Sequence, residues 1–371
     1  MDSACLALNR AALGRKPWGT SVATGQDDRP DTIEPPDHRR HVKPTLRTIS
    51  EITGLGVTTV SRALKDGPEL SLETRARVQA VAAELKYRPD RAGVRLRTGR
   101  TFVVGLILDQ NVAVAEFERR IIMGVSRVLY QTSYHLVVMP QATDADPMEP
   151  IRYFVETGGA DGLIFTHTRP QDRRVQYLLE RDFPFVTHGR TESVEQHPFY
   201  DFDNERFTAE SVRRLVQRGR RRLALVEPPR HLTCHRHTME GFREAVATAG
   251  VESMIVHGVH TDESPANFRE AALALTNAPN RPDGVVCANE TGCVAFIAGL
   301  RDGGMTIGKD VDVIAKGTSE LLDHTHPAID SFYEDLTFGG EELARLLLRR
   351  IDGAPVADLQ TLGEPRLQRR T

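Results

Sequence analysis

From residue 102 to the end of the chain, short apolar runs alternate with longer amphipathic segments. The apolar runs that predict strands cover 103–108, 136–139, 162–165, 185–187, 223–226, 254–256, 285–288 and 311–314. The segments long enough for helices include 118–130, 206–217, 239–249, 267–276, 292–302 and 340–351. This alternation predicts parallel sheets with helices on both faces. Because ~270 residues exceed the usual size of a single core, we expect two similar lobes.

Residues 45–86 carry a different pattern, which predicts three short helices. Thr45 can cap the first helix and Gly54 ends it, the second covers 57–64, and the third follows Ser71. The apolar residues expected on the inner faces of the first and third helices are Leu46, Ile49, Ile52, Val78, Val81, Ala82 and Leu85. Two helices joined by a tight turn at this spacing are typical of a helix-turn-helix, whose second helix enters the DNA major groove.

The second of these helices has side chains that can contact bases. Its outer side is expected to carry Val57, Thr58, Ser61 and Arg62. Arg62 can make two hydrogen bonds to a guanine edge, and the methyl groups of Val57 can meet a thymine methyl. Thr58 and Ser61 can donate to bases or phosphates. A generic three-helix bundle is the alternative interpretation of the same pattern.

The net charge of -3 is unevenly distributed along the chain. Residues 43–100 contain twelve Lys or Arg and six Asp or Glu, whereas residues 1–42 contain six of each sign. The remainder of the chain therefore carries nine excess negative charges. A basic module attached to an acidic body is expected of a protein with a polyanion-binding head.

Two segments flank the helical module. Residues 1–42 hold Gly, Pro and Asp clusters without sustained periodicity, which predicts a disordered extension. Residues 90–101 are basic, and a helix of two turns there would be too short to be stable alone. We therefore divide the chain into the extension at 1–42, a helix-turn-helix headpiece at 43–89, a hinge or linker at 90–101 and a two-lobed core at 102–371.

Three runs of the headpiece agree in order and spacing with a known motif. They are ISEITGLGVTTVSRAL at 49–64, SLETRARV at 71–78 and LKYRPD at 85–90. These runs resemble the headpiece of the lactose-repressor (LacI/GalR) family. The resemblance implies that a hinge helix inserts Leu96 into the minor groove and bends the duplex. Gly93 stands where the family often has alanine, and glycine weakens a helix by about 0.8–1 kcal/mol.

Helix pattern and resemblance together imply one set of DNA-contacting residues. It consists of Thr45, Leu46, Val57, Thr58, Thr59, Ser61, Arg62, Tyr87, Arg91, Leu96 and Arg97. A palindromic double-stranded operator and a homodimer are the partners that the resemblance implies, because half-sites on DNA mirror the twofold symmetry of the protein.

The core resembles the same family more weakly. The matching segments are the strand at 103–108, DFDN at 201–204, EGFR at 240–243 and ANE at 288–290. The resemblance implies a small all-α helix-turn-helix headpiece plus a two-lobed α/β core similar to periplasmic binding proteins. It places the first lobe at about 102–200 plus 331–352 and the second lobe at about 201–330, with a ligand cleft between them.

Ligands of open parallel sheets bind beyond the carboxyl ends of the strands. The polar and aromatic side chains expected in the cleft are Asp109, Phe117, His188, Arg190, Asp203, Arg236, Glu290 and Lys316. Such a set suits the hydroxyl groups and the apolar face of a sugar, so a mono- or oligosaccharide is the expected effector, acting as inducer or corepressor. This chain departs from the family at Thr238, where an arginine is usual, and at AKGT (315–318), where Gly-aromatic-Asp-Asp is common.

The preferred hypothesis is a transcriptional regulator, most simply a repressor, whose operator affinity is controlled by a small molecule. One alternative is a cytoplasmic solute-binding protein without a DNA role, which fits poorly with the basic headpiece and the lack of a signal peptide. Another alternative is an enzyme on a two-lobed scaffold. No phosphate-binding loop, dinucleotide fingerprint or nucleophile elbow supports an enzyme.

The remaining sequence features bear on compartment and cofactors. Four cysteines without a CxxC pair fit a reducing cytoplasm, and no apolar run approaches the ~18 residues that span a bilayer. The pairs His235-x-His237 and His324-x-His326 lack further ligands at a metal-site spacing. We therefore expect a cytoplasmic protein with no cofactor, no metal and no membrane contact.

Overall fold

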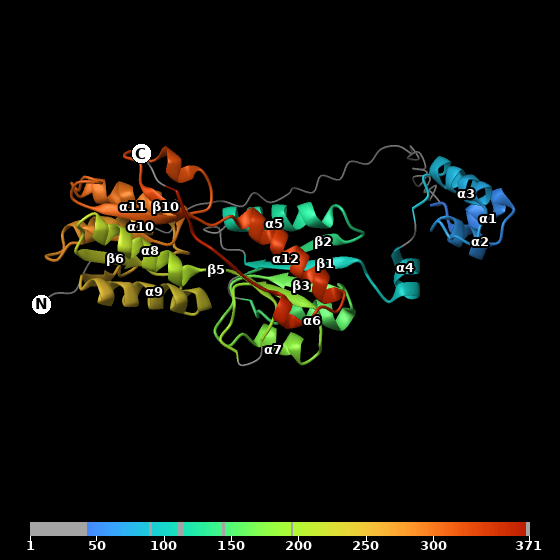
Figure 1. The fold of residues 1–371 in the computed structure, drawn as a ribbon, viewed down its shortest axis with the longest axis horizontal. Helices are drawn as coiled ribbons and strands as arrows, with labels where there is room; N and C mark the ends of the chain where they lie inside the picture. Colours follow the sequence, from blue (N-terminus) through green and yellow to red (C-terminus); the bar gives the residue numbers. More distant parts are fainter. Residues whose placement is uncertain (1–42, 89–90, 110–114, 143–144, 194–195, 369–371) are drawn as a thin grey trace, which may run out of the picture. The chain divides into compact units, whose positions relative to one another are not determined.

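The chain divides into two compact units, one ending at Pro89 and the other beginning at Asp90. The computed structural model describes residues 43–88, 91–109, 115–142, 145–193 and 196–368, so the expected extension at 1–42 lies outside the described residues. The headpiece contains helices α1 (Leu46–Thr53), α2 (Val57–Ala63) and α3 (Leu72–Glu84), drawn in blue in Figure 1.

Local signals fix the ends of the headpiece helices. The Thr45 hydroxyl accepts a hydrogen bond from the backbone N–H of Thr48 at 3.2 Å, and Ser71 caps α3 in the same way. Gly54 ends α1 at φ 68°, a left-handed conformation that favours glycine. The three predicted helices are therefore confirmed.

The core of the headpiece is small and apolar. Its fully or almost fully buried residues are Ile49, Val60, Ala63, Val78 and Ala82. Ile52 is 56% exposed, so its prediction as an inner-face residue is wrong. The 3.6-residue helical period places Thr53 in line with Leu46 and Ile49, and the Thr53 hydroxyl donates to the carbonyl of Ile49 at 2.7 Å.

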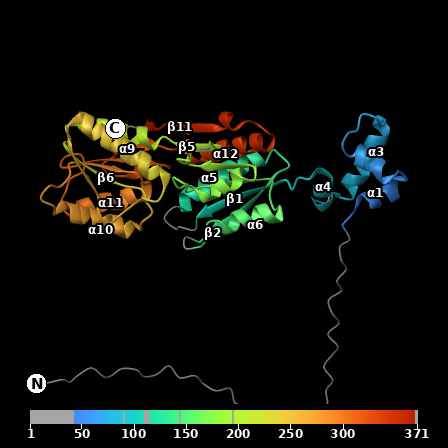
Figure 2. The same ribbon diagram turned by 90° about the horizontal axis from the view of Figure 1, so that it is seen from below.

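The second unit contains two six-stranded sheets with helices packed on both faces (Figures 1 and 2). The first lobe, preceded by α4 (Arg91–Thr98), comprises β1 (Val103–Asp109), α5 (Ala115–Leu129), β2 (His135–Gln141), α6 (Glu149–Thr157), β3 (Gly162–Phe165), α7 (Arg173–Leu179), β4 (Phe185–His188), β5 (Phe199–Phe202), α12 (Leu336–Ile351), η3 (Val356–Asp358) and β11 (Gln360–Gly363). The second lobe comprises α8 (Asn204–Gln217), β6 (Arg222–Val226), α9 (Thr233–Ala249), β7 (Glu252–Ile255), α10 (Pro265–Thr276), β8 (Gly284–Cys287), α11 (Glu290–Asp302), β9 (Asp312–Gly317), η2 (Leu321–His324), β10 (Asp330–Tyr333) and β12 (Arg366–Gln368).

The strands of the two sheets follow one another in the same spatial order, counted from the first strand of each lobe. The first sheet runs β11-β5-β4-β3-β1-β2, and the second runs β12-β10-β9-β8-β6-β7. All neighbours are parallel except β10 and β12, so the carboxyl ends of the parallel strands lie at one edge of each sheet. The expected α/β fold class with two lobes is confirmed.

Side-chain alternation along the strands explains the three layers of each lobe. On β6, Ala224 and Val226 pack into the cluster that contains α10 and α11, whereas Leu223 and Leu225 pack into the cluster that contains α8 and α9. Helices α8 and α9 approach closely at Gly241, where a Cβ atom would lie 2.1 Å from a backbone oxygen of α8. The sequence therefore buries both faces of the sheet.

The chain passes between the lobes three times. The crossings lie between β5 and α8, between β10 and α12, and between β11 and β12. All eight predicted strands are confirmed. The four that the apolar pattern missed, β5, β10, β11 and β12, have three or four residues each and flank these crossings.

Candidate ligand cleft and DNA-contact face

A cleft of about 170 Å³ lies where the carboxyl ends of both sheets meet. Its lining includes residues at or just after β3, β4, β5, β8 and β9. The side chains that line it are Glu116, Phe117, His167, Thr168, His188, Asp201, Asn204, Leu232, Cys234, Thr261, Asp262, Ala288, Asn289, Glu290, Thr291, Lys316, Thr318 and Glu334, together with Gly189. This is the position at which open α/β sheets bind small molecules.

A buried ion pair forms the floor of the cleft. The Lys316 ammonium lies 3.0 Å from the Glu334 carboxylate and donates to the side-chain oxygen of Asn204 at 3.3 Å. The Nε2 atom of His188 lies 3.5 Å from the other oxygen of Glu334. Burial opposes ionisation of Glu334, but the positive charge of Lys316 and the contact with His188 outweigh it and lower the pKa of Glu334 to about 2. The residues of the floor therefore come from four places: Lys316 from β9, His188 from β4, and Asn204 and Glu334 from the crossings after β5 and β10.

A second buried carboxylate lies beside this pair. Burial raises the pKa of Asp201 to about 6, against the opposing positive charges of His188 and Arg190. The Arg190 guanidinium lies 3.1 Å from Asp201, and His237 of α9 lies 3.9 Å from it. Burial and the charge of Arg190 lower the pKa of His237 to about 4. A ligand in the cleft would therefore meet several charged side chains that are already paired with one another.

Aromatic rings form one wall of the cleft. The Phe117 ring of α5 lies edge-on to His188, with centroids 5.0 Å apart, and 5.7 Å from the ring of His167. Glu290, the first residue of α11, lines the cleft from the second lobe. Its carboxylate accepts hydrogen bonds from the Ser319 backbone and from the Thr318 hydroxyl at 3.0 and 2.9 Å. The lining therefore combines aromatic rings of the first lobe with hydrogen-bonding groups of the second.

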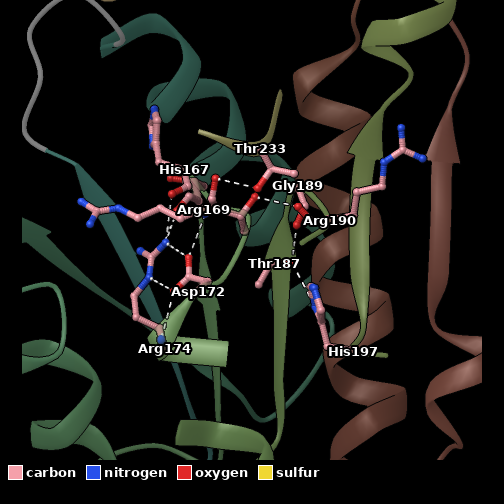
Figure 3. Close-up of polar contacts among 11 residues, drawn as sticks. His167, Arg169, Asp172, Arg174, Thr187, Gly189, Arg190, His197 and Thr233 are labelled. Atoms are coloured by element: carbon pink, nitrogen blue, oxygen red, sulfur yellow. Dashed lines mark hydrogen bonds and ion pairs between the residues drawn. The ribbon is translucent and has the colours of Figure 1, made fainter. Parts of the chain in front are cut away.

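The loop between β3 and α7 contributes His167 and Thr168 to the cleft lining, and Figure 3 shows the polar contacts of this loop. Arg174 is buried, bonds both oxygens of Asp172 at 3.0 and 2.7 Å, and donates to the carbonyl of His167 at 2.9 Å. The Thr168 carbonyl accepts from the backbone and the hydroxyl of Thr233 on α9, at 2.9 and 3.1 Å. This loop of the first lobe is therefore bonded directly to the second lobe.

The structure brings together only part of the ligand set expected from sequence. Phe117, His188, Glu290 and Lys316 line the cleft, and the side chain of Asp109 lies outside the described residues. Two others, Arg190 and Asp203, line a separate hollow between α8 and α9, although Arg190 reaches Asp201 from there. Arg236 is 57% exposed outside the cleft and pairs with Glu192 and Glu240.

Several cleft residues were missed because their strands were missed. Asp201 lies within β5 and Glu334 directly follows β10, two strands of four residues that interrupt their apolar residues with aspartate or serine. His167 follows β3 and carried a recoverable signal, since it lies at the carboxyl end of a predicted strand. Among the described residues, no group of three His, Cys, Asp or Glu side chains is arranged to hold a metal ion.

The outer face of α2 carries the expected DNA-contacting residues of that helix. Val57 is 45% exposed, Thr58 and Arg62 are exposed, and Thr59 and Ser61 are half-buried. The Arg62 guanidinium lies 3.6 Å from Glu69, in an exposed pair that a phosphate or base could replace.

The other predicted DNA-contacting residues fall into three groups. Thr45 is exposed at the N-terminus of α1, while Leu46 and Tyr87 are half-buried and pack on the headpiece core. Leu96 of α4 is 89% exposed, an unusual environment for leucine. The side chains of Arg91 and Arg97 lie outside the described residues.

Comparison with known proteins assigns the family. Residues 45–90 match the family described as "Bacterial regulatory proteins, lacI family", and residues 212–371 match "Periplasmic binding protein-like domain". The chain is 32% identical over 280 residues to the HTH-type transcriptional regulator AglR of Rhizobium meliloti (strain 1021), covering 73% of this chain and 76% of that protein. It is 30% identical over 339 residues to the HTH-type transcriptional regulator CelR of Thermobifida fusca, covering 88% and 98%. The chain belongs to the LacI family of bacterial regulatory proteins.

Solved structures agree with this assignment. The structure titled "transcriptional regulator CelR-cellobiose complex" superposes with a TM-score of 0.64 at 26% identity, covering 88% of this chain and 99% of that chain. A lac repressor dimer bound to operator and the anti-inducer ONPF gives a TM-score of 0.78 at 19% identity, covering 88% and 98%, and bears on the fold alone. The chain is thus a DNA-binding transcriptional regulator and not an enzyme, and the predicted family is confirmed. No helix in the described part of the chain is long and apolar enough to cross a bilayer.

Proposed function

We propose that this regulator is a homodimeric repressor whose affinity for a palindromic operator is controlled by a neutral sugar bound in the cleft. The observation that carries this proposal is the buried Lys316–Glu334 pair at the cleft floor, flanked by Phe117 and His188. One relative has been solved with cellobiose, which supports a sugar for this cleft too.

The charges of the cleft favour a neutral polyhydroxyl ligand. Lys316 is the basic side chain among the described lining residues apart from the histidines, and Glu334 already neutralises it. A carboxylate or phosphate on the ligand would face Glu334, Glu290 and Asp262 without a free cation. Sugar hydroxyls can instead both donate to carboxylates and accept from the ammonium, and a sugar's apolar face fits an aromatic ring.

DNA binding is assigned to the headpiece and the hinge segment around α4. We expect Arg62, Thr58 and Val57 to contact base edges and the exposed Leu96 to enter the minor groove. Thr45, Leu46, Thr59, Ser61, Tyr87, Arg91 and Arg97 complete the proposed DNA-contacting set. In this division of the chain, the headpiece at 43–89 and the hinge at 90–101 precede the core at 102–371, which contains the effector cleft.

Effector and operator binding are coupled through the relative angle of the lobes in this proposal. The effector contacts His188 from the first lobe and Lys316 from the second, so it binds one lobe arrangement better than another and shifts the population toward it. We expect the protein in the cytoplasm, because a sugar-controlled regulator of transcription must meet both operator DNA and imported sugars.

The test begins with selection of operator sequences from a random duplex library by the full-length protein. Fluorescence anisotropy then measures binding of a selected palindromic duplex with and without millimolar neutral sugars. We expect affinity to fall steeply with salt, because phosphate contacts release counterions. Selection of no palindromic sequence, or binding that neither salt nor any sugar alters, would contradict the proposal.

A further inference from the structure

A smaller hollow adjoins the cleft beside the loop that follows β3. This side compartment encloses about 90 Å³ and shares His167, Leu232 and Asp262 with the main cleft. The polar side chains that line it without lining the main cleft are Gln141, Thr166, Arg169, Arg174 and His231. The two hollows adjoin, and polar groups dominate the lining of the smaller one.

A buried ion pair fixes the wall of the side compartment (Figure 3). The side chains of Arg174 and Asp172 are 9% and 3% exposed, and Asp172 also accepts from the backbone of Arg169 at 3.1 Å. Arg174 donates to the carbonyls of Thr166 and His167 at 3.3 and 2.9 Å. Because every group of the pair has a partner, the loop has one defined shape.

His167 occupies an unusual backbone conformation at the junction of the two hollows. Its φ is 54°, in the left-handed region that costs a non-glycine residue roughly 1–2 kcal/mol. The bonds from Arg174 hold this conformation, and the Nδ1 atom of His167 lies 2.9 Å from the Thr166 hydroxyl. Strain of this kind persists where the surroundings over-determine it, often at ligand sites. The imidazole is thereby positioned between the main and side compartments.

We propose that the effector is a neutral sugar of at least two rings, with one ring in the main cleft and the second in the side compartment. This inference rests on the proposed function and narrows it from sugars in general to disaccharides or longer oligosaccharides. His167 and Asp262 flank the glycosidic linkage, while Gln141 and His231 bond the second ring. A monosaccharide fills the main cleft alone and leaves the side compartment unused.

The position of the second ring also explains how it could influence the lobes. The loop that forms the wall bonds the second lobe through the Thr168 carbonyl and Thr233. A ring held against His167 and Arg169 packs on that loop next to this contact. The second ring therefore stabilises the arrangement in which the lobes are bonded, whereas a single ring in the main cleft meets this loop only at His167 and Thr168.

Isothermal titration calorimetry of the full-length protein tests the inference with maltose, cellobiose and melibiose against glucose and galactose. We expect at least one disaccharide to bind about 100-fold more tightly than its constituent monosaccharides, which equals about 2.8 kcal/mol. Ala145→Trp, which places an indole in the side compartment, should remove this advantage and leave monosaccharide affinity unchanged. Ala357→Trp, an exposed site away from the cleft, is the matched control.

A second pair of variants addresses His167 directly. His167→Gly should lower disaccharide affinity at least tenfold and glucose affinity by a smaller factor, because His167 lines both hollows, and His167→Asn, which tolerates a positive φ and keeps a polar group, should recover part of both losses. Equal affinities for disaccharides and monosaccharides would overturn the inference and leave the proposed function intact. Binding of none of these sugars, with operator binding retained, would overturn both.

Discussion

The outer face of α2 and the floor of the cleft are built in opposite ways. On α2, Val57 and Arg62 are exposed and stand on a helix whose stability comes from a small apolar core beneath. In the cleft, Lys316 and Glu334 are themselves part of the interior, and each stabilises the other's charge. Truncation on α2 should therefore cost binding alone, whereas truncation at the floor should cost both folding and binding.

The largest effect is expected for Glu334→Ala. Removal of the carboxylate leaves the buried Lys316 ammonium without its counter-ion, which should lower the free energy of unfolding of the core by about 3–5 kcal/mol. Urea unfolding followed by far-ultraviolet circular dichroism measures this loss. Glu364→Ala is the control, because its pair with Arg206 is exposed and should contribute less than about 1 kcal/mol. If both variants lose the same free energy of unfolding, the buried pair at the cleft floor stabilises the protein no more than an exposed surface pair does.

A double replacement sharpens the same comparison. Glu334→Leu with Lys316→Met removes both charges and keeps apolar volume, so stability should return to within about 1–2 kcal/mol of the parent protein. Sugar binding should remain lost, because the cleft then lacks its polar floor. Recovery of stability without recovery of sugar binding would separate the structural role of the pair from its role in ligand binding.

Leu96→Ala should produce the next largest effect, and on DNA binding alone. Leu96 is 89% exposed without DNA, so its burial in a minor groove would gain about 1.5–3 kcal/mol. We expect specific operator affinity to fall by that amount and the bend of the duplex to decrease, with the urea midpoint unchanged. Anisotropy and a fluorescence-transfer measurement of bending report the two effects. An unchanged bend would contradict the proposed wedge.

Arg62→Ala should cost about 1–3 kcal/mol of operator affinity and relax preference at one base pair. Core stability and sugar binding should stay unchanged, because the Arg62 side chain is exposed at the headpiece surface, where it pairs with Glu69. Arg213→Ala in α8 is the control for loss of one exposed positive charge. If affinity falls equally for all DNA sequences and the base preference does not change, Arg62 contacts a phosphate and not a base edge.

The contrast also explains what the sequence could predict. The helices of the headpiece follow from local signals, Thr45, Gly54 and Ser71, and the 3.6-residue period then places Val57 and Arg62 outside. Cleft residues come instead from the ends of strands in two lobes. Phe117, His188, Glu290 and Lys316 were found because they belong to or follow strongly patterned elements.

The remaining cleft residues depend on tertiary pairing. β5 and β10 become strands because each pairs in parallel with a strongly apolar strand, β4 and β9, and not because of their own pattern. Asp201 and Glu334 therefore gave no signal in the apolar pattern, although Asp201 begins the DFDN segment (201–204) that resembles the family. Arg236 belongs to α9 and lies on the exposed side of that helix, where it pairs with Glu192 and Glu240.

The smallest expected effect concerns pH and separates the two buried carboxylates of the cleft. The pKa of Asp201 is raised from 3.8 to about 6, so the folded state favours its protonated form. The contribution of this group to stability is therefore full below about pH 4 and is lost as pH rises through 6. Glu334, with a pKa lowered to about 2, loses its contribution only in much stronger acid.

Asp201→Asn should thus gain stability relative to the parent protein as pH rises from 4 to 7, by on the order of 2 kcal/mol, because the raised pKa of Asp201 already includes its attraction to Arg190. His237 titrates in the same range with a pKa of about 4 and weakens the fold on acidification, so the parent protein alone would show little net slope. The comparison of variant with parent removes the titration of Asp201 and keeps in both proteins that of His237, which lies 3.9 Å from Asp201; Glu334 and His188 also face Asp201 in the parent. Urea unfolding of both proteins at pH 4, 5, 6 and 7 measures it. A difference that does not change with pH would mean that the pKa of Asp201 is the same in the folded and the unfolded protein, and would contradict the raised pKa.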